Sequence, residues 1–487
     1  MLLFGRRFST SSKLGTAAAA KIKNTASLSR PNYDFKAIRA APEVYQDSVD
    51  RRRAKLAGGA TIADFVDLYS TLLTAKSERD ELLFKRKTIQ NQLKNGKRGQ
   101  EKENGHTSSL DSSEDPRTIL SHIKNLLKER EKHIISLEDT IYPLVESIPN
   151  LISPDSIIDN QQLVGMIHAD KQIPADPTRS HKDIGVNLGI LDFDSASRVS
   201  GTSSYYLVND GALLEQALIQ YALSKCRQHG WSMLTPPSLV RQEFTTACGF
   251  KPRDQNNEQQ VYIIADDALN GESKVGSHCL TGTAEIPLAG YNAHKTIPLT
   301  ENDRPVIRKA GVSRSYRAEA GARGADTKGL YRVHEFSKVE MFAWTTSSDV
   351  STSIKVHEEM LSLQKEILTE LGLCCRVLNM PPDDLGAPAY KKYDIEAWMP
   401  GRGSWGEVTS TSNCLDYQSR RLHTKYHTAD GSLRYAMTLN GTAMAVPRVI
   451  IAIIENNYDP QMNRIEIPSV LRKYMDENLY IEYQGPN

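Results

Sequence analysis

The sequence predicts an α+β protein in which an antiparallel pair of long N-terminal helices precedes a domain built on an antiparallel sheet. Three observations lead to this fold class. Two long segments before residue 150 carry apolar residues spaced alternately by three and four, as in paired helices. From His181 to the C-terminus, helical patterns alternate with apolar β-type runs. Within that second part, Gly311–Trp344 reads as two strands joined by a long glycine-containing loop, which predicts an antiparallel hairpin.

Length and composition describe an ordinary globular chain. Its 487 residues allow two or three domains, and the 39% hydrophobic and 24% charged residues are typical of soluble proteins. No apolar run approaches the roughly 20 residues that span a bilayer, so we expect no stable membrane association. The net charge of +1 means that contacts with nucleic acid must come from local patches. The six cysteines have no CxxC pairing or metal-ligand spacing, which argues for reduced residues and against a zinc site.

Residues 1–33 have the composition of a mitochondrial transit peptide. Basic residues occur among many Ser, Thr and Ala, and no acidic residue precedes Asp34. We therefore expect a location in the mitochondrial matrix. The alternative is a disordered basic tail that binds RNA. A secretory signal fits poorly, because no apolar core of suitable length follows the charges.

Residues 34–150 are predicted to form the helical arm. A short helical element, Asp34–Leu56, precedes two series of residues at coiled-coil spacing. The first series is Phe65, Leu68, Leu72, Ala75, Arg79, Leu82, Arg86, Ile89 and Leu93, and the second is Leu120, Ile123, Leu127, Arg130, Ile134, Leu137, Ile141, Leu144 and Ile148. The polar stretch Asn95–Pro116 between them has no periodicity and suits a flexible tip.

Basic side chains gather toward the predicted tip of this arm. They are Lys85, Arg86, Lys87, Lys94, Lys97 and Arg98 in the first helix, and Lys124, Lys128, Arg130 and Lys132 in the second. Such charges can be the solvated face of a coiled coil, or they can contact a phosphate backbone. Residues 151–180, with three prolines, are predicted to be a linker, and residues 181–487 are predicted to form the second domain.

The hairpin at Gly311–Trp344 carries charges that suit a nucleotide triphosphate. Its inner positions hold Arg317, Glu319, Arg332, His334, Phe336 and Glu340. Guanidinium groups can clamp phosphate, and an aromatic ring can stack on a base. The alternative is a hairpin with a solvated charged face.

The same hairpin resembles a known family. An Arg-x-Glu strand, a glycine loop and a strand ending in Phe resemble the second signature motif of class II aminoacyl-tRNA synthetases. The wording EAGARGADTKGLYRVHEFSKVE resembles seryl-tRNA synthetases in particular. The resemblance implies an ATP site formed by Arg317, Ala318, Glu319, Val333, His334, Glu335, Phe336, Glu407, Val408, Thr409, Ser410 and Arg448.

Leu280–Gly290 holds a carboxylate and a hydroxyl that could bind an ammonium group. Thr283 and Glu285 are two residues apart and share a face if the segment is extended. Alone, these residues read more readily as a turn. Placed before the hairpin, they resemble the serine-recognition loop of the family. The resemblance implies a serine site formed by Thr283, Ala284, Glu285, Arg317, Glu340, Asn440 and Thr442.

Gly403–Arg421 offers oxygen ligands for a metal. Glu407 begins an alternating run with Thr409 and Thr411 in register, and Ser410 adds a hydroxyl. Carboxylate and hydroxyl oxygens suit Mg²⁺ that bridges phosphates, and the alternative is a Ser/Thr-rich edge strand. The resemblance to the ATP- and metal-binding strand of the family implies that Glu407 and Ser410 bind the metal.

Thr438–Asn456 resembles the third class II motif. Asn440, Gly441 and Thr442 are predicted to form a strand-to-helix turn, and Arg448 starts an apolar helix. A charged residue at the start of a buried helix needs a partner, which could be any carboxylate. In the family this arginine grips the γ-phosphate. A fainter first motif, Ala212–Gln228 followed by Trp231–Val240, implies a homodimer.

The resemblance extends from Asp34 to the C-terminus and implies an activity. It implies ATP-dependent activation of L-serine and its transfer to tRNA(Ser), with Mg²⁺ as cofactor and with Arg317, Glu407 and Arg448 as the catalytic residues. The helical arm resembles the one that cradles the long variable arm of the tRNA. Two alternatives remain at this point: a ligase that charges a carrier protein, and a non-catalytic RNA-binding protein on a synthetase scaffold.

Overall fold

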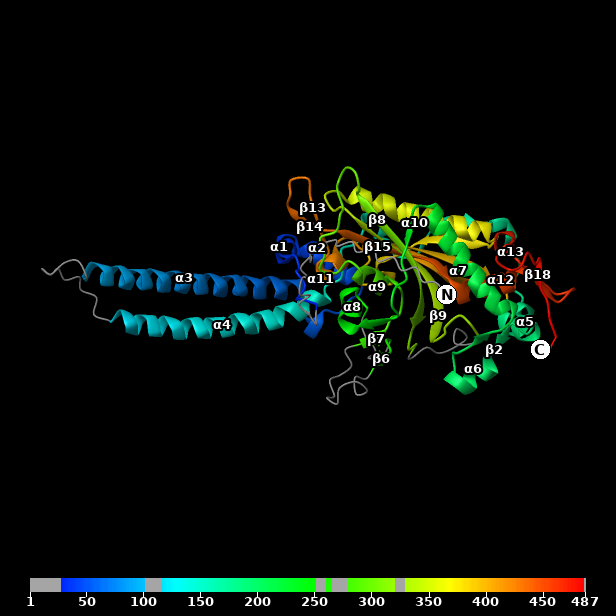
Figure 1. The fold of residues 1–487 in the computed structure, drawn as a ribbon, viewed down its shortest axis with the longest axis horizontal. Helices are drawn as coiled ribbons and strands as arrows, with labels where there is room; N and C mark the ends of the chain where they lie inside the picture. The colour runs from blue at the N-terminus through cyan, green and yellow to red at the C-terminus, as the bar shows by residue number, and fades with distance from the viewer. Residues whose placement is uncertain (1–27, 101–114, 251–259, 265–277, 320–328, 486–487) are drawn as a thin grey trace, which may run out of the picture.

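The protein consists of a long two-helix arm attached to a compact body that contains a large sheet (Figure 1). The computed structural model describes residues 28–100, 115–250, 260–264, 278–319 and 329–485, with the helical path alone for residues 95–100. This arrangement confirms the predicted fold class.

The arm consists of helices α3 (Ile62–Gln100) and α4 (Pro116–Ser147). They run antiparallel, and ion pairs join Lys76 to Glu138 and Arg130 to Glu78, each at 2.8 Å. Helices α1 (Phe35–Ala40) and α2 (Pro42–Arg51) lie at the base. The buried residues along the arm include nine of the predicted seam: Phe65, Leu72, Ala75, Ile123, Leu127, Ile134, Ile141, Leu144 and Ile148.

The predicted flexible tip was wrong in part. Helix α3 continues to Gln100, five residues beyond the expected start of the tip at Asn95. The return helix begins where expected: Pro116 occupies its first turn, and the Asp115 carboxylate accepts a hydrogen bond from the backbone N–H of Arg117. Most of the expected tip lies outside the described residues, as do the side chains of Lys97 and Arg98.

Eight strands form the main sheet, in the order β1-β10-β11-β12-β15-β9-β8-β4. Their bounds are β1 Gln162–Ile167, β10 Cys375–Asn379, β11 Lys391–Met399, β12 Ser404–Asn413, β15 Met437–Ala445, β9 Glu335–Thr345, β8 Val306–Tyr316 and β4 Ser232–Met233. Every neighbouring pair is antiparallel except β4 with β8. Because β1 comes from residues 151–180, the segment predicted to be a linker supplies an edge strand of the sheet.

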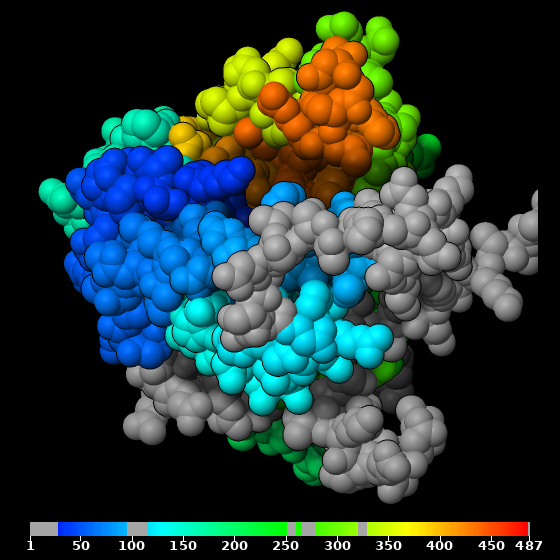
Figure 2. All heavy atoms as spheres, turned by 90° about the vertical axis from the view of Figure 1, so that its left-hand side faces the viewer, coloured from blue at the N-terminus to red at the C-terminus, as the bar shows by residue number. Residues whose placement is uncertain are grey.

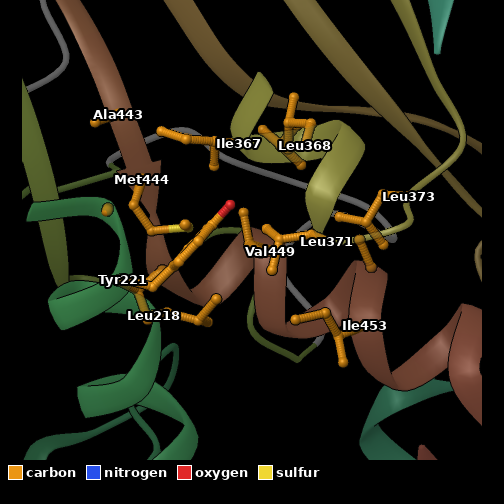
Figure 3. Packing of buried hydrophobic residues seen from close by; sticks show 14 of the residues in the cluster. Leu218, Tyr221, Ile367, Leu368, Leu371, Leu373, Ala443, Met444, Val449 and Ile453 are labelled. Atoms are coloured by element: carbon orange, nitrogen blue, oxygen red, sulfur yellow. The ribbon is translucent and has the colours of Figure 1, made fainter. Parts of the chain in front are cut away.

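Helices cover both faces of this sheet. On one face, α7 (Asp210–Gln228), α10 (Val350–Glu370) and α12 (Val446–Asn457) enclose the larger core, where Tyr221, Ile367 and Val449 pack together (Figure 3). On the other face, α8 (Gln242–Ala247), α9 (Glu285–Gly290) and α11 (Tyr417–Leu422) flank a second core. Strand β9 alternates between the two cores, with Met341 in the first and Phe342 in the second.

Shorter elements complete the body. They are α5 His181–Asn187, β2 Leu191–Asp192, α6 Phe193–Ser200, β3 Tyr206–Leu207, β5 Leu239–Arg241, β6 Ile263–Ile264, β7 His278–Leu280, β13 Lys425–His427, β14 Leu433–Tyr435, β16 Tyr458–Asp459, β17 Arg464–Glu466, α13 Ser469–Arg472 and β18 Tyr480–Ile481. Within the segment Trp231–Val240, β4 is followed by an irregular stretch with two prolines, and β5 begins at Leu239. None of the described helices is long and apolar enough to cross a membrane. All six cysteines are buried, and none forms a disulfide.

The base of the arm is fastened to the body by a buried guanidinium. Arg52, 7% exposed, donates hydrogen bonds to the carbonyls of Ala389 at 2.6 Å, Gly386 at 3.0 Å and Leu151 at 3.1 Å. Three carbonyl acceptors from two distant segments satisfy a charge that burial would otherwise disfavour. Figure 2 looks along the arm from its tip, so its residues, blue to cyan, lie in front of the body.

Residues 28–33, which the sequence assigned to the end of the transit peptide, pack onto the folded protein. Leu28 lies against the second core, and Ser29 Oγ lies 2.9 Å from Nε2 of His423. Arg30 bonds to Asp139 at 3.1 Å, and its guanidinium lies 4.3 Å from the ring centre of Tyr142. These six residues therefore belong to the fold, whereas residues 1–27 lie outside the described part of the chain.

Candidate active site

The predicted hairpin is present and forms one wall of a polar pocket. Strands β8 and β9 pair in antiparallel register from Val306 with Thr345 to Tyr316 with Glu335. The second strand starts at Glu335, and residues 329–334 form an irregular segment before it. Since alternate residues of β9 share a face, Phe336, Lys338 and Glu340 lie on the side opposite the larger core.

The pocket lies at the end of the hairpin where β8 ends and β9 begins, and it is rich in cations. It is lined by four cationic side chains, Arg317, Arg332, Lys338 and Arg448, and by two carboxylates, Glu319 and Glu407. Leu330, Tyr331, Val333, Phe336, Val408, Thr409, Ser410, Thr442, Ala445 and Pro447 complete the lining. This excess of positive charge beside an aromatic ring suits a polyphosphate attached to a base.

Arg317 lies at the centre of this pocket. Its guanidinium carbon is 5.3 Å from the ring centre of Phe336, and its Nε donates a hydrogen bond to the Gly282 carbonyl at 3.5 Å. Burial, and then the nearby charge of Arg448, lowers the pKa of Arg317. Glu319 follows with a φ of +47°, a left-handed conformation that is costly for a non-glycine residue and common at functional sites.

Arg448 pairs with Glu407 across the pocket. Pro447 stands in the first turn of α12, and Nη1 of Arg448 lies 3.2 Å from Oε2 and 3.0 Å from the backbone oxygen of Glu407. The partner expected for this buried arginine is therefore Glu407. Burial opposes ionisation of this carboxyl, but Arg448, Lys392 and Arg317 outweigh it and hold the pKa of Glu407 at about 2.

A second carboxylate, Glu285, lies buried at the start of α9. Its Oε1 accepts hydrogen bonds from Nε2 of Gln418 at 2.6 Å and from Nδ2 of Asn440 at 2.9 Å. Burial, and then the negative charge of Glu340, raises its pKa to about 7. A buried carboxylate held by neutral amides is a suitable counter-ion for a small cationic ligand.

Glu340 belongs to the same polar cluster and is 1% exposed. Its Oε2 pairs with Nζ of Lys338 at 2.6 Å and accepts a hydrogen bond from Thr283 Oγ1 at 3.3 Å. The ammonium of Lys338 also donates to Thr283 Oγ1 at 3.0 Å. Lys338 was missed in the sequence, although its even spacing from Phe336 and Glu340 on one strand predicts the same face.

Two local predictions behind this cluster were wrong, although the residues do meet. Thr283 and Glu285 do not alternate on an extended strand, because Glu285 begins helix α9 after the fully buried Ala284. Asn440 and Thr442 do not form a turn; they lie within β15 and pair with β9, Thr442 opposite Glu340. The structure therefore brings all seven predicted serine-site residues to this end of the sheet by tertiary pairing.

The alternation predicted for Glu407, Thr409 and Thr411 is broken by a bulge. Ile395 pairs with Thr409 and Glu396 pairs with Glu407, so Val408 is an extra residue in β12. Beyond the bulge, Thr411 Oγ1 lies 3.9 Å from the sulfur of Met360 in α10. Ser410 lines the pocket with Glu407, as expected for the metal pair.

Three other predicted nucleotide-site residues present no side chain to this pocket. His334 and Glu335 line a separate cavity on the other side of the hairpin, with Arg314 and Tyr205. His334 instead contacts the backbone of Arg317: its carbonyl accepts the Arg317 N–H at 2.9 Å, and its Nδ1 lies 3.1 Å from the Arg317 carbonyl oxygen. Ala318 likewise bonds through its backbone N–H, to the carbonyl of Gln260 at 3.1 Å.

The oxygen groups beside Glu407 fit a hard divalent cation. Asp394 pairs in register with Ser410, and its Oδ1 is buried without a hydrogen-bond partner. Burial raises the pKa of Asp394 to about 7, and the Glu407 charge adds to this rise against the lowering effect of Lys392. Among the described residues, no group of three or more His, Cys, Asp or Glu side chains could hold a metal. Glu407 and Ser410 offer the oxygen ligands that Mg²⁺ prefers, and Mg²⁺ takes its other ligands from waters and phosphates.

Comparisons with known proteins agree with this geometry. Residues 278–457 match the family model described as the tRNA synthetase class II core domain (G, H, P, S and T). The mitochondrial serine–tRNA ligase of Saccharomyces cerevisiae is 43% identical over 459 residues, 93% of this chain and 97% of the yeast protein. The mitochondrial serine–tRNA ligase of Mus musculus is 41% identical over 72% of this chain and 67% of its own length.

A solved structure extends the likeness to nearly the whole fold. The seryl-tRNA synthetase of Pyrococcus horikoshii, crystallised with ATP, superposes with a TM-score of 0.79 at 29% identity. The alignment covers 93% of this chain and all of that one.

Proposed function

The chain belongs to the seryl-tRNA synthetases of class II, and on that premise we propose that its cation-rich pocket activates L-serine with ATP and charges tRNA(Ser). In the first step a carboxylate oxygen of serine attacks the α-phosphorus, and pyrophosphate leaves. In the second step the terminal ribose hydroxyl of the tRNA attacks the seryl carbonyl, and AMP leaves. A carboxylate is already nucleophilic, so positioning and charge stabilisation carry the catalysis.

This proposal rests on one observation: the cation-rich pocket lies next to the carboxylate cluster of Glu285 and Glu340. Arg317 stands between them and would hold the α-phosphate together with the serine carboxylate. Arg448 would hold the γ-phosphate, and Phe336, which already stacks against Arg317, would receive the adenine ring. Fixed guanidinium groups in a buried site stabilise the developing phosphate charge without reorganisation.

The cluster around Glu285 would recognise serine. Both amide donors bond to Oε1 of Glu285, so Oε2 is the oxygen through which we expect it to bind the substrate ammonium. Thr283, Glu340, Asn440 and Thr442 supply further polar groups for the small side chain. An analogue without the hydroxyl would leave buried polar groups unpaired, which is the basis of strong discrimination.

We propose Mg²⁺ as the cofactor, held by Glu407 and Ser410. When bound, the metal neutralises negative charge on the phosphates and helps to orient them. The low pKa of Glu407 keeps this carboxylate ionised at every physiological pH, ready for a cation. Arg448, whose Nη1 lies 3.2 Å from Oε2 of Glu407, holds that carboxylate in place.

The remaining partners and the location are proposed on several grounds. The basic residues of α3 and α4 suit a tRNA backbone. Strand β4 forms an edge of the main sheet after α7, in the segment that resembles the family's dimer motif, and supports a homodimer. The yeast and mouse relatives are mitochondrial by name, which with the basic N-terminus supports the matrix. Since residues 28–33 are part of the fold, the transit peptide would end before Leu28.

Amino-acid-dependent ATP–pyrophosphate exchange tests the proposed function. Purified protein is assayed with serine, threonine, alanine and glycine, and then with purified tRNA for charging. Exchange with serine alone, followed by seryl-tRNA formation, is expected. Exchange without charging of any tRNA would favour a carrier-protein ligase, and no exchange with any amino acid would favour a non-catalytic RNA-binding protein.

A further inference from the structure

Tyr331 supports both members of the Arg448–Glu407 pair. The guanidinium of Arg448 lies 4.7 Å from its ring centre, and that of Arg402 lies 3.8 Å from it. The Tyr331 hydroxyl accepts a hydrogen bond from the backbone N–H of Glu407 at 3.1 Å. The position of Tyr331 therefore affects both Arg448, which is proposed to bind phosphate, and Glu407, which is proposed to bind the metal.

The backbone that carries Tyr331 has no strand or helix of its own. Residues 329–334 form turns and bends before β9 begins. Immediately before Tyr331, the N–H of Leu330 donates to Nε2 of His181 at 3.2 Å, across 149 residues of sequence. Leu330 itself is fully buried, so the loss of this bond would leave a polar group without a partner in the interior.

His181 is in turn fixed by a buried carboxylate. Its Nδ1 lies 2.8 Å from Oε1 of Glu455, whose side chain is 1% exposed and belongs to α12, the helix that also carries Arg448. The other oxygen of Glu455 accepts the backbone N–H of Arg402 at 3.1 Å. A carboxylate at Nδ1 and an N–H donor at Nε2 assign the proton to Nδ1, with Nε2 as acceptor.

The contact at Gly329 leaves no room for a side chain. This residue has a φ of +79°, and a Cβ built on it would overlap Nε2 of His181 and lie 2.9 Å from Cε1. Both the backbone conformation and the close approach of the imidazole therefore require glycine here.

We propose that His181 is a positioning residue for ATP. With Glu455 behind it, His181 fixes the backbone at Gly329 and Leu330 and so holds Tyr331 against Arg448 and Glu407. The inference rests on the proposed function in so far as this pocket binds ATP. Glu285, which is proposed to bind serine, lies outside this chain of contacts. Loss of His181 should therefore affect ATP binding and spare serine binding.

The test uses His181→Ala in the full-length protein, with His168→Ala as the matched control. His168 is half-buried, and its ring bonds to the Thr369 carbonyl at 2.9 Å, away from the nucleotide pocket. We expect the Kd for ATP, measured by calorimetry, and the KM for ATP in serine-dependent exchange to rise about tenfold in His181→Ala, the effect of one lost buried hydrogen bond. The KM for serine should stay within about twofold, and His168→Ala should behave as wild type.

A double-mutant cycle with Gly329→Ala tests the contact itself and remains informative if His181→Ala folds poorly. Gly329→Ala alone should weaken ATP binding at least as much as His181→Ala. In the His181→Ala background, the added methyl group no longer meets the imidazole, so the second substitution should cost less than it does alone. Strictly additive effects, an unchanged ATP affinity in His181→Ala, or equal rises in the KM for ATP and serine would each overturn the proposal. Wild-type protein that binds ATP without exchange would refute the proposed function, and the calorimetric comparison would still decide on His181.

Discussion

Acid should weaken serine use by protonating Glu285. This carboxyl is buried among Glu340, Lys338, Arg317 and Gln418, and its pKa in the ligand-free protein is about 7. A raised pKa means that the protonated form predominates below pH 7, and only the ionised form can pair with the ammonium of serine. The kcat/KM for serine, which reports the enzyme before it binds serine, should therefore fall as pH drops through 7.

The size of the effect follows from that pKa. A carboxyl with a pKa of about 7 is roughly 90% ionised at pH 8 and roughly 10% at pH 6, so kcat/KM for serine should fall about tenfold between them. A carboxyl with its ordinary pKa of 4.5 would lose only a few per cent of its ionised form over the same interval. Bound serine adds a cation that keeps Glu285 ionised, so kcat at saturating serine should vary much less.

Pyrophosphate exchange from pH 5.5 to 8.5, at saturating ATP, provides the measurement. Gln418→Met removes one hydrogen bond that favours the ionised form of Glu285, and it should move the acid limb to higher pH. Glu285→Gln should abolish the limb and most of the activity. A flat profile between pH 8 and 6, or an acid limb that persists unchanged in Glu285→Gln, would refute the reasoning.

Three further predictions concern the phosphates, the arm and the N-terminus. Arg317→Ala and Arg448→Ala should each lower the exchange rate about a hundredfold or more with little change in Tm, and near wild-type exchange in either would remove that residue from the phosphate site. Deletion of Lys85–Arg130 with bridged ends should spare exchange and cripple tRNA charging, whereas equal charging would reduce the arm to a spacer. A truncated protein that starts at Leu28 should keep full stability, but one that starts at Asp34 should lose about 1–2 kcal/mol of unfolding free energy. Equal denaturation midpoints for the two proteins would contradict a structural role for residues 28–33.

The sequence predicts the parts of the site that lie on regular strands. The two hairpin strands and the presence of Arg317 and Phe336 in one site follow from local alternation and charge, whereas most of the predicted glycine loop lies outside the described residues. By the same rule Lys338 was predictable, because it lies two residues from both Phe336 and Glu340. The register of Glu407 could not be predicted. A single bulged residue, Val408, exchanges the two faces of the strand after it, and no local sequence pattern marks the bulge.

Other parts depend on contacts that no local pattern encodes. Gln418 reaches Glu285 across 133 residues, and His181 reaches Leu330 across 149. The same holds for residues 151–180, whose strand β1 joins the sheet by pairing with β10. Several apolar side chains of β1 are exposed, so its local pattern does not predict this pairing. Tertiary pairing decides the role of such segments, whatever their local composition suggests.

The structure of the protein with a non-hydrolysable seryl-adenylate analogue and Mg²⁺ tests the central claim most directly. We expect the ammonium group to lie on Oε2 of Glu285, the phosphate on Arg317 and the adenine on Phe336, with Tyr331 in its present place. An analogue bound in any other cavity, or bound here with its ammonium group away from Glu285, would contradict the account.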